Sequence, residues 1–263
     1  MTQDVPHLWF WPSTDSEMLS VAVRAAAFLS AAERQRATRF MRQSDSWRFQ
    51  ASRIFLRTVL AHYTQTCPSQ LNLTIEEGGK PVLCSSAVDD LSFSLSHCGS
   101  SVAVAVGCGV MLGVDIEGPP RVGLVETLAR RYFAPREFCD IASLQGEDQI
   151  RQFLAYWTLK EAYGKAIGTG LSAGLRAQFD LSDPKGRIYK INPHGAPDPA
   201  WGFAQYEVGH QLCMSAAWKG GITLAKLSLF HVSVKISGQA RRCLSAGDVT
   251  FATIPVNVPR FTD

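Results

Sequence analysis

Residues 101–117 read SVAVAVGCGVMLGVDIE, and this stretch decides the fold. It contains two runs rich in small and β-branched residues, 101–107 and 111–117, which is the composition of buried strands. A Gly-Cys-Gly turn at 107–109 separates the runs, so we expect the two strands to form a hairpin. The stretch therefore predicts a β region near the middle of the chain.

Helical and strand patterns alternate on either side of this region. On the N-terminal side we expect, in order, a strand at 8–10 with a loop to residue 20, helices at 31–42 and 46–64, and strands at 71–77 and 91–97. On the C-terminal side we expect helices at 122–133, 135–144 and 147–167, with Gly168 and Gly170 ending the last, and strands at 176–181, 186–191, 201–208, 211–218 and 224–235. The order helix, strands, helix, strands predicts an α+β fold of two similar halves.

The order of elements also suggests the domain organisation. We divide the chain into an N-terminal α+β half at 1–112, a C-terminal α+β half at 113–235 and a tail at 236–263. The tail is polar and interrupted by Gly and Pro, so we expect it to be loosely attached. With 263 residues, the chain is long enough to fold without a metal or a disulfide.

Charge is nearly balanced over the whole chain but not along it. The 26 basic and 23 acidic residues give a net charge of +3, which excludes bulk attraction to DNA or a membrane. Seven arginines nevertheless lie between residues 34 and 57, opposed only by Asp45. Arginine suits bidentate recognition of phosphate. This Arg cluster leaves an Arg-rich nucleic-acid-binding protein as one alternative, with binding that weakens steeply in salt.

The sequence shows no targeting or metal-binding pattern. Its seven cysteines are scattered without CxxC or CxxH spacing, so we expect no zinc site. It has no basic leader followed by a long apolar run, and no stretch of about 18 apolar residues. We therefore expect a cytoplasmic protein with mostly reduced cysteines and no membrane partner.

Asp115 and Glu117 end the apolar β region. Because side chains alternate along a strand, both carboxylates point to the same side, roughly 7 Å apart along the chain. Two like charges in this position repel each other. Either they are solvated at a strand end, or they share a divalent cation, and the pair alone leaves both interpretations open.

Glu161 continues an apolar stripe, with Leu154 and Trp157, on the helix expected at 147–167. A salt bridge to Lys165 would contribute only about 0.3–0.5 kcal/mol. Burying an unpaired carboxylate costs several kcal/mol, so that salt bridge is a weak explanation. A cation shared with the two strand carboxylates explains Glu161 better. Three hard oxygen ligands would leave positions for water and phosphate oxygens, as Mg²⁺ prefers.

Ser96 and His97 end an alternating strand just before a Cys-Gly turn, which can expose backbone amides to an anion. A lone histidine is most often structural, but the turn that follows His97 could bind an anion. Lys80 and Lys165, together with the Arg cluster, would form a cradle for a polyphosphate ligand. The sequence has no GxSxG elbow and no Walker A loop, which argues against a Ser-His-Asp hydrolase and a P-loop nucleotide hydrolase.

Four segments of the chain occur in a characteristic order. They are Gly79-Lys80-Pro81, FSLSH at 93–97, GVDIE at 113–117 and WTLKEAYGK at 157–165. Together they resemble the signature of the 4′-phosphopantetheinyl transferases, and the chain length resembles the Sfp-type branch of that family. Each segment is weakly specific alone, whereas four in order are specific.

The resemblance implies a fold and a reaction. It implies a monomer of two pseudo-symmetric α+β halves with the active site in the cleft between them. Coenzyme A binds there, with Mg²⁺ on its pyrophosphate, and a serine of an apo acyl or peptidyl carrier protein attacks the β-phosphate. Phosphopantetheine is transferred and 3′,5′-adenosine bisphosphate leaves. The enzyme would be of the holo-[acyl-carrier-protein] synthase type, serving fatty acid, polyketide or non-ribosomal peptide synthesis.

The resemblance also implies residue roles. Asp115, Glu117 and Glu161 would hold Mg²⁺. Glu161 and Glu137 are rival general bases, and Lys165 would stabilise charge on the transferring phosphate. The coenzyme contacts implied are those of Arg36, Lys80, Pro81, Ser96, His97, Lys160 and Lys165.

One residue departs from the family pattern. Glu33 stands three residues before Arg36, where some relatives carry a lysine, and this bears on recognition of the coenzyme's 3′-phosphate. A catalytically inactive coenzyme A-binding relative is the remaining alternative, against which the intact DxE and KExxxK segments argue.

Overall fold

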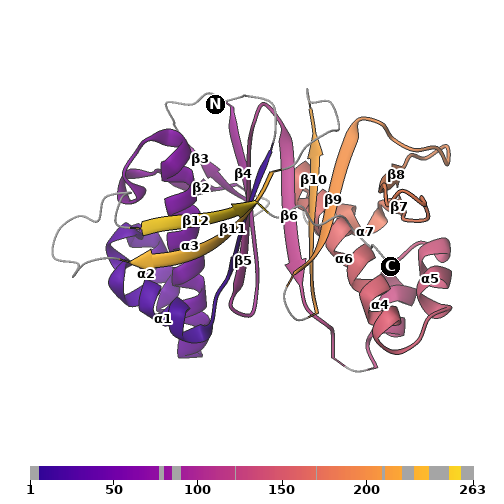
Figure 1. The fold of residues 1–263 in the computed structure, drawn as a ribbon, viewed down its shortest axis with the longest axis horizontal. Helices are drawn as coiled ribbons and strands as arrows, with labels where there is room; N and C mark the ends of the chain where they lie inside the picture. Colours follow the sequence, from indigo (N-terminus) through magenta and orange to yellow (C-terminus); the bar gives the residue numbers. More distant parts are fainter. Residues whose placement is uncertain are drawn as a thin grey trace.

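The computed structural model describes residues 6–76, 80–84, 90–121, 123–169, 171–208, 211–220, 228–236 and 249–255. Of the expected features, the glycines at 78, 79 and 170 lie outside these ranges. Two sheets lie at the centre of the molecule and helices cover both outer sides (Figure 1). The expected α+β fold class is confirmed.

The N lobe is built on a five-stranded sheet with the order β12-β11-β1-β5-β4. Its strands are β1 (His7–Pro12), β4 (Leu91–Cys98), β5 (Ser101–Cys108), β11 (Ser228–Ile236) and β12 (Val249–Pro255). Its helices are α1 (Asp15–Arg24), α2 (Ala31–Ala37) and α3 (Gln43–Thr64), and β2 (Leu73–Ile75) and β3 (Pro81–Leu83) form a small separate ribbon.

Helix α1 replaces the loop that we expected up to residue 20, so that expectation was wrong. Thr14 caps the helix, because its hydroxyl accepts the Glu17 N–H at 3.3 Å and the Glu17 carboxylate accepts the Thr14 N–H at 2.8 Å. This reciprocal pair is a capping box, which the T-x-x-E spacing contained. Helix α1 then packs against α3.

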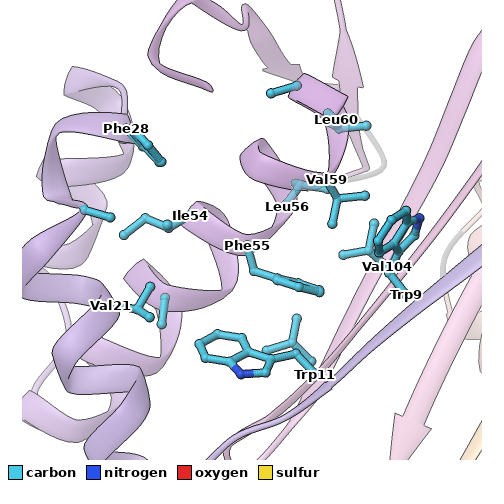
Figure 2. Packing of buried hydrophobic residues seen from close by; sticks show 14 of the residues in the cluster. Trp9, Trp11, Val21, Phe28, Ile54, Phe55, Leu56, Val59, Leu60 and Val104 are labelled. Carbon is cyan, nitrogen blue, oxygen red and sulfur yellow. The ribbon is translucent and has the colours of Figure 1, made fainter. Parts of the chain in front are cut away.

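Aromatic side chains of β1 pack against α3 in the N-lobe core (Figure 2). Phe55 and Val59 of α3 point toward the sheet, where Trp9, Trp11 and Val104 lie. All five are almost fully buried. The alternation of strand side chains therefore assigns one face of this sheet to the helices.

The C lobe is built on a three-stranded sheet with the order β6-β10-β9. These strands are β6 (Met111–Glu117), β9 (Trp201–Val208) and β10 (Leu212–Lys219). The helices are α4 (Val125–Tyr132), α5 (Pro135–Ala142), α6 (Gly146–Ile167) and α7 (Leu171–Arg176), followed by the short ribbon of β7 (Gln178–Asp180) and β8 (Tyr189–Ile191). Residue 176, expected to begin a strand, ends α7 instead.

The hairpin expected between 101–107 and 111–117 is wrong. Strand β5 pairs with β1 and β4, whereas β6 pairs with β10 in the other sheet. The physical reason is burial, because β5 is buried on both faces and needs a second apolar layer. The two sheets stack on a shared core made by Leu8, Phe10, Ala103, Ala105, Val110, Leu112, Val114, Ile116, Val208, Met214, Ala216 and Trp218.

The C-terminal strands join a different sheet from the one that the expected division of the chain implies. Strand β11 lies in the segment assigned to the C-terminal half, and β12 lies in the expected tail at 236–263. Both extend the N-lobe sheet, with β11 parallel to β1 and β12 antiparallel to β11. The passage between the sheets at 109–111 lies close to the expected boundary at residue 112, and the division there stays a prediction.

No described helix combines the length and the apolar composition needed to cross a bilayer.

Gly113 brings β6 into direct contact with α6. A Cβ on this residue would lie 2.0 Å from the carbonyl oxygen of Ala162 and 2.6 Å from the amide nitrogen of Ala166. Both neighbours are backbone atoms, which cannot rotate away. The glycine of the GVDIE segment is therefore required by close packing.

We expect Gly113→Ala to lower the free energy of unfolding by about 3 kcal/mol or more, because α6 must move away from β6. Urea unfolding measures the loss. Adding Ala162→Gly should not rescue the variant, since the clash is with backbone. A wild-type midpoint for Gly113→Ala would contradict this packing.

Candidate functional site

Asp115 lies on the side of β6 that faces α6 and is almost completely buried. Its Oδ1 accepts hydrogen bonds from the Ser96 hydroxyl at 2.8 Å and from the Lys165 ammonium at 2.7 Å. Its Oδ2 is buried and has no partner among the described residues. A buried acceptor without a partner is costly, so this oxygen marks a place for a ligand.

Two serines of β4 hold β6 where Asp115 can meet them. The Ser94 hydroxyl accepts the Val114 N–H at 3.1 Å, and the Ser96 hydroxyl accepts the Ile116 N–H at 3.4 Å. Among the described strands, β6 is at the edge of its sheet, and none pairs with these amides on that side. Serine side chains from the other sheet satisfy them, and the site lies at this seam between the lobes.

Lys165, from the last turn of α6, completes the seam. Its ammonium donates to the Ser96 hydroxyl at 2.8 Å as well as to Asp115, and its side chain is 30% exposed. It therefore pairs with Asp115, rather than with Glu161 one turn earlier on the helix. Strand β4, strand β6 and helix α6 each contribute one residue to this contact.

Glu117 and Glu161 belong to the same electrostatic group. Burial, and next the Asp115 carboxylate, raise the pKa of each of them to about 7, while the Lys165 ammonium lowers it. Glu161 also raises the pKa of Glu117. Among the described residues, however, no three acidic, His or Cys side chains come together closely enough to hold a metal as they stand. The joint metal site of Asp115, Glu117 and Glu161 stays a prediction.

His97 and Lys80 lie in environments that disfavour their charged forms. Partial desolvation lowers the pKa of the His97 ring, and the positive charges of Lys165 and Arg53 lower it further. Burial likewise lowers the pKa of Lys80, which stands just before Pro81 in β3. The structure thus brings His97 near Lys165, and the coenzyme contacts of Lys80 and Pro81 stay predictions.

Arg53 is a site candidate that the sequence reasoning did not single out. The guanidinium groups of Arg36 and Arg53 lie 5.3 and 5.5 Å from the centre of the same Phe49 ring. Arg53 is also close enough to His97 to lower its pKa. The spacing of Phe49 and Arg53, one helical turn apart in the expected helix at 46–64, was the available signal.

Glu33, the departure from the family pattern, has a structural role. Its carboxylate forms an ion pair with the fully buried Arg57 at 2.8 Å and caps α2 by accepting the Ser30 N–H at 2.8 Å. Arg57 also donates to the carbonyls of Pro68 and Leu71. One arginine of the cluster is therefore used to hold the N lobe together.

Glu137 and Lys160 form a buried ion pair inside the C lobe. Their charged atoms lie 2.8 Å apart, and neither side chain is more than 2% exposed. Glu137 also accepts the backbone N–H groups of Ala134 and Phe179, and Lys160 donates to the carbonyls of Leu175 and Ala177. Both charged groups are thus bound inside the C lobe. A general-base role for Glu137 and a coenzyme contact for Lys160 stay predictions without support from the geometry.

Comparisons with known proteins agree with this architecture. Residues 111–217 match the family described as the 4′-phosphopantetheinyl transferase superfamily, and residues 11–108 match a 4′-phosphopantetheinyl transferase N-terminal family. The boundary between the two matches falls where the chain passes from the first sheet to the second.

Individual relatives extend over both lobes. The 4′-phosphopantetheinyl transferase HetI of Nostoc sp. is 38% identical over 173 residues, which cover 65% of this chain and 72% of the relative. The 4′-phosphopantetheinyl transferase Sfp of Bacillus subtilis is 30% identical over 152 residues, covering 58% of this chain and 66% of the relative. The mouse L-aminoadipate-semialdehyde dehydrogenase-phosphopantetheinyl transferase is 26% identical over 250 residues, covering 88% and 81%.

The fold, the matched families and these relatives define a transferase enzyme that modifies carrier proteins. The chain belongs to the 4′-phosphopantetheinyl transferase superfamily. The resemblance drawn from the four sequence segments is thereby confirmed, and membership of the family implies coenzyme A as the substrate.

The raised pKa values of Glu117 and Glu161 predict how stability depends on pH. The folded chain holds protons on these carboxyls up to about pH 7, whereas the unfolded chain releases them near 4.5. Their contribution to the free energy of unfolding is therefore favourable at low pH and lost between those values. Denaturation is measured without divalent cations for wild type and for the double variant Glu117→Gln/Glu161→Gln. Between pH 5 and 7.5, the free energy of unfolding should fall more in wild type than in the double variant. Parallel pH profiles would contradict this.

The Glu137–Lys160 pair predicts a large loss on removal of one partner. Lys160→Met should lower the free energy of unfolding by about 3–5 kcal/mol, because it leaves a buried carboxylate without its cation. Adding Glu137→Gln removes that charge while keeping an acceptor for a backbone N–H, so the double variant should recover part of the loss. Urea titrations measure both. A double variant less stable than Lys160→Met would rule out charge compensation.

Proposed function

We propose that this chain transfers 4′-phosphopantetheine from coenzyme A to a serine of an apo acyl or peptidyl carrier protein, in a reaction that requires Mg²⁺ and releases 3′,5′-adenosine bisphosphate. The observation that carries the proposal is the buried Asp115 carboxylate. One of its oxygens is paired with Lys165 and Ser96, and the other has no partner in the described part of the chain. The site has acceptor capacity left for a cation.

The donor set fits Mg²⁺. Magnesium prefers hard oxygen ligands, usually one or two carboxylates together with waters and substrate phosphates. The unpartnered Oδ2 of Asp115 is such a donor, and Glu117 and Glu161 are near enough to sense its charge. These three residues would hold the ion. When bound, it would neutralise charge on the pyrophosphate oxygens.

Lys165 supports transfer by placing an ammonium at the edge of the site. Its side chain is partly exposed, and its contacts to Asp115 and Ser96 fix its position at the seam. From there it can stabilise charge on the phosphate being transferred, which is the main task in phosphoryl transfer. Loss of Lys165 should therefore affect turnover more than coenzyme binding.

Glu161 is the better candidate for the general base. Its side chain is only partly buried and lies in the group of Asp115 and Lys165, whereas Glu137 is enclosed by Lys160 and two backbone amides. Glu161 would accept the proton of the carrier serine, directly or through water. The serine oxygen then forms a bond to the β-phosphorus as the bond to adenosine bisphosphate breaks, and the leaving oxygen keeps that electron pair.

The basic residues of the N lobe suit the adenosine bisphosphate part of the coenzyme. Arg36 and Arg53 flank Phe49, and Arg53 is near His97, which is in turn near Lys165. Basic groups therefore extend from α2 toward the seam. Arg57 and Arg48 are bound to Glu33 and Asp15, so fewer arginines are available for the alternative of nucleic-acid binding.

The carboxylates predict a loss of transfer without a loss of fold. Asp115→Ala and Glu161→Ala should each reduce labelling of a carrier protein by fluorescent coenzyme A more than about a hundredfold, because Mg²⁺ loses a ligand. Asp198→Asn, which removes a carboxylate paired with Lys190 outside the seam, is the matched control. Full activity in either alanine variant would remove the metal-site proposal.

Lys165→Met separates turnover from binding. We expect kcat to fall on the order of a hundredfold, as for removal of one transition-state donor, with a much smaller rise in KM for coenzyme A. Steady-state kinetics at saturating carrier protein measures both. Equal changes in the two would mean that Lys165 only binds the coenzyme.

The reaction itself is tested by mass spectrometry of apo-carrier proteins from fatty acid, polyketide and non-ribosomal peptide systems. Incubation with coenzyme A and Mg²⁺ should add the mass of one phosphopantetheine to at least one carrier, and chelation should prevent the gain. No gain on any carrier would overturn the proposal. The proposed cytoplasmic location and monomeric state stay predictions, and size-exclusion chromatography tests the latter.

A further inference from the structure

A buried polar cluster lies between α6 and the C-lobe sheet, just behind the proposed site. It consists of Thr158 on α6, Ser215 on β10 and Gln205 on β9, and we call it the α6 polar cluster. Its three side chains are fully or almost fully buried. The surrounding contacts are mostly apolar, such as those of Leu159 and Ala162.

Hydrogen bonds join the three side chains of the α6 polar cluster to one another and to the backbone of α6. The Gln205 amide nitrogen donates to the Ala155 carbonyl and to the Ser215 hydroxyl, each at 2.8 Å. The Thr158 hydroxyl uses its one proton on the Leu154 carbonyl at 2.8 Å. Its oxygen therefore accepts from the Ser215 hydroxyl at 2.7 Å and from the Gln205 amide nitrogen at 3.3 Å. Two residues of the sheet are thus bound to two positions of α6, Ala155 and Thr158.

The register connects this cluster to the proposed site. Ser215 stands directly opposite Asp115 in the β10–β6 pairing. Thr158 precedes Glu161 by three residues and Lys165 by seven, so all three share one side of α6. The Thr158–Ser215 contact therefore joins the helix to the sheet at the level of the carboxylate that Lys165 and Glu161 must face.

Stability alone is a poor explanation for the cluster. The Gln205 side-chain oxygen is buried and has no partner in the described residues. A partly satisfied polar network is generally no more stable than apolar side chains of the same shape. Polar contacts in this layer instead specify the orientation of α6. Apolar contacts would let the helix rotate or slide, whereas hydrogen bonds restrict both movements.

We propose that Thr158, Ser215 and Gln205 are positioning residues, which set the rotation and axial position of α6 so that Glu161 and Lys165 face Asp115. They act through the helix and touch no reacting atom. The inference rests on the proposed function for its kinetic readout. It extends that function by explaining why a hydroxyl stands three residues before the glutamate.

The decisive variant replaces the whole cluster by apolar side chains, Thr158→Val/Ser215→Ala/Gln205→Leu. We expect its unfolding temperature to equal or exceed that of wild type, while kcat falls roughly tenfold to a hundredfold with KM for coenzyme A within about twofold, because small misplacements of catalytic groups are costly. Unchanged kcat would overturn the proposal. A strongly lowered unfolding temperature would also overturn it, since stability would then be the role of the cluster.

Single substitutions provide the matched controls. Thr158→Ser keeps the hydroxyl and should retain kcat, whereas Thr158→Val should lose it. Thr58→Val in α3 removes an equally buried threonine that donates to its own helix at Ile54 over the same 2.8 Å. It should match the stability change of Thr158→Val without the loss of kcat. Equal kcat losses in Thr58→Val and Thr158→Val would contradict positioning.

A second readout separates this inference from the proposed function. If wild-type protein modifies no carrier, the proposed function fails. The positioning role is then measured with Mg²⁺, because Glu161 would be one of its ligands. Wild type and the apolar variant are first saturated with coenzyme A, and the further rise in unfolding temperature on adding Mg²⁺ is compared. A smaller rise in the apolar variant supports positioning. An equal rise, or no rise in either protein, overturns it.

Discussion

The binding of β6 to β4 through serine hydroxyls is the interaction on which the rest of this structure depends. Two sheets that stack by apolar contacts alone could slide over each other. Ser94 and Ser96 prevent this by accepting backbone N–H groups of β6. The same Ser96 hydroxyl donates to Asp115 and accepts from Lys165. The contact that aligns the lobes is therefore also part of the proposed active site, and the two could not be optimised separately.

Most residues of the candidate site could be found from the sequence because they are charged side chains in otherwise apolar stretches. Carboxylates at Asp115 and Glu117 end an apolar strand, and Glu161 continues an apolar stripe, so each needed a chemical reason. The structure brings Asp115 together with Ser96 and Lys165, which were expected on separate elements. Glu137 and Lys160 could not be interpreted in this way, because a buried ion pair becomes visible only when both partners are placed.

The errors in the expected fold have a common physical origin. Strand composition shows that 101–107 and 111–117 are buried, but it does not say which strand pairs with which. Strands adjacent in the sequence usually pair with each other. Here β6 instead joins the second sheet, which covers the other apolar face of β5. Similarly, strand β11 pairs with β1 more than 200 residues away in the sequence, a long-range contact that no local pattern encodes. The capping box of α1 was readable from the T-x-x-E spacing at 14–17, where we expected a loop.

The pairing of β11 with β1 makes the C lobe a continuous insertion between two parts of the N lobe. Strands β6 to β10 can complete their own sheet with residues 111–219, whereas the N-lobe sheet must wait for residues 228–255. During synthesis, the second lobe emerges from the ribosome and can fold while β1 still has an open edge. Pairing across so long a separation is slow. Closure of the first lobe is accordingly expected to be the last step of folding, with its aggregation-prone edge exposed until then.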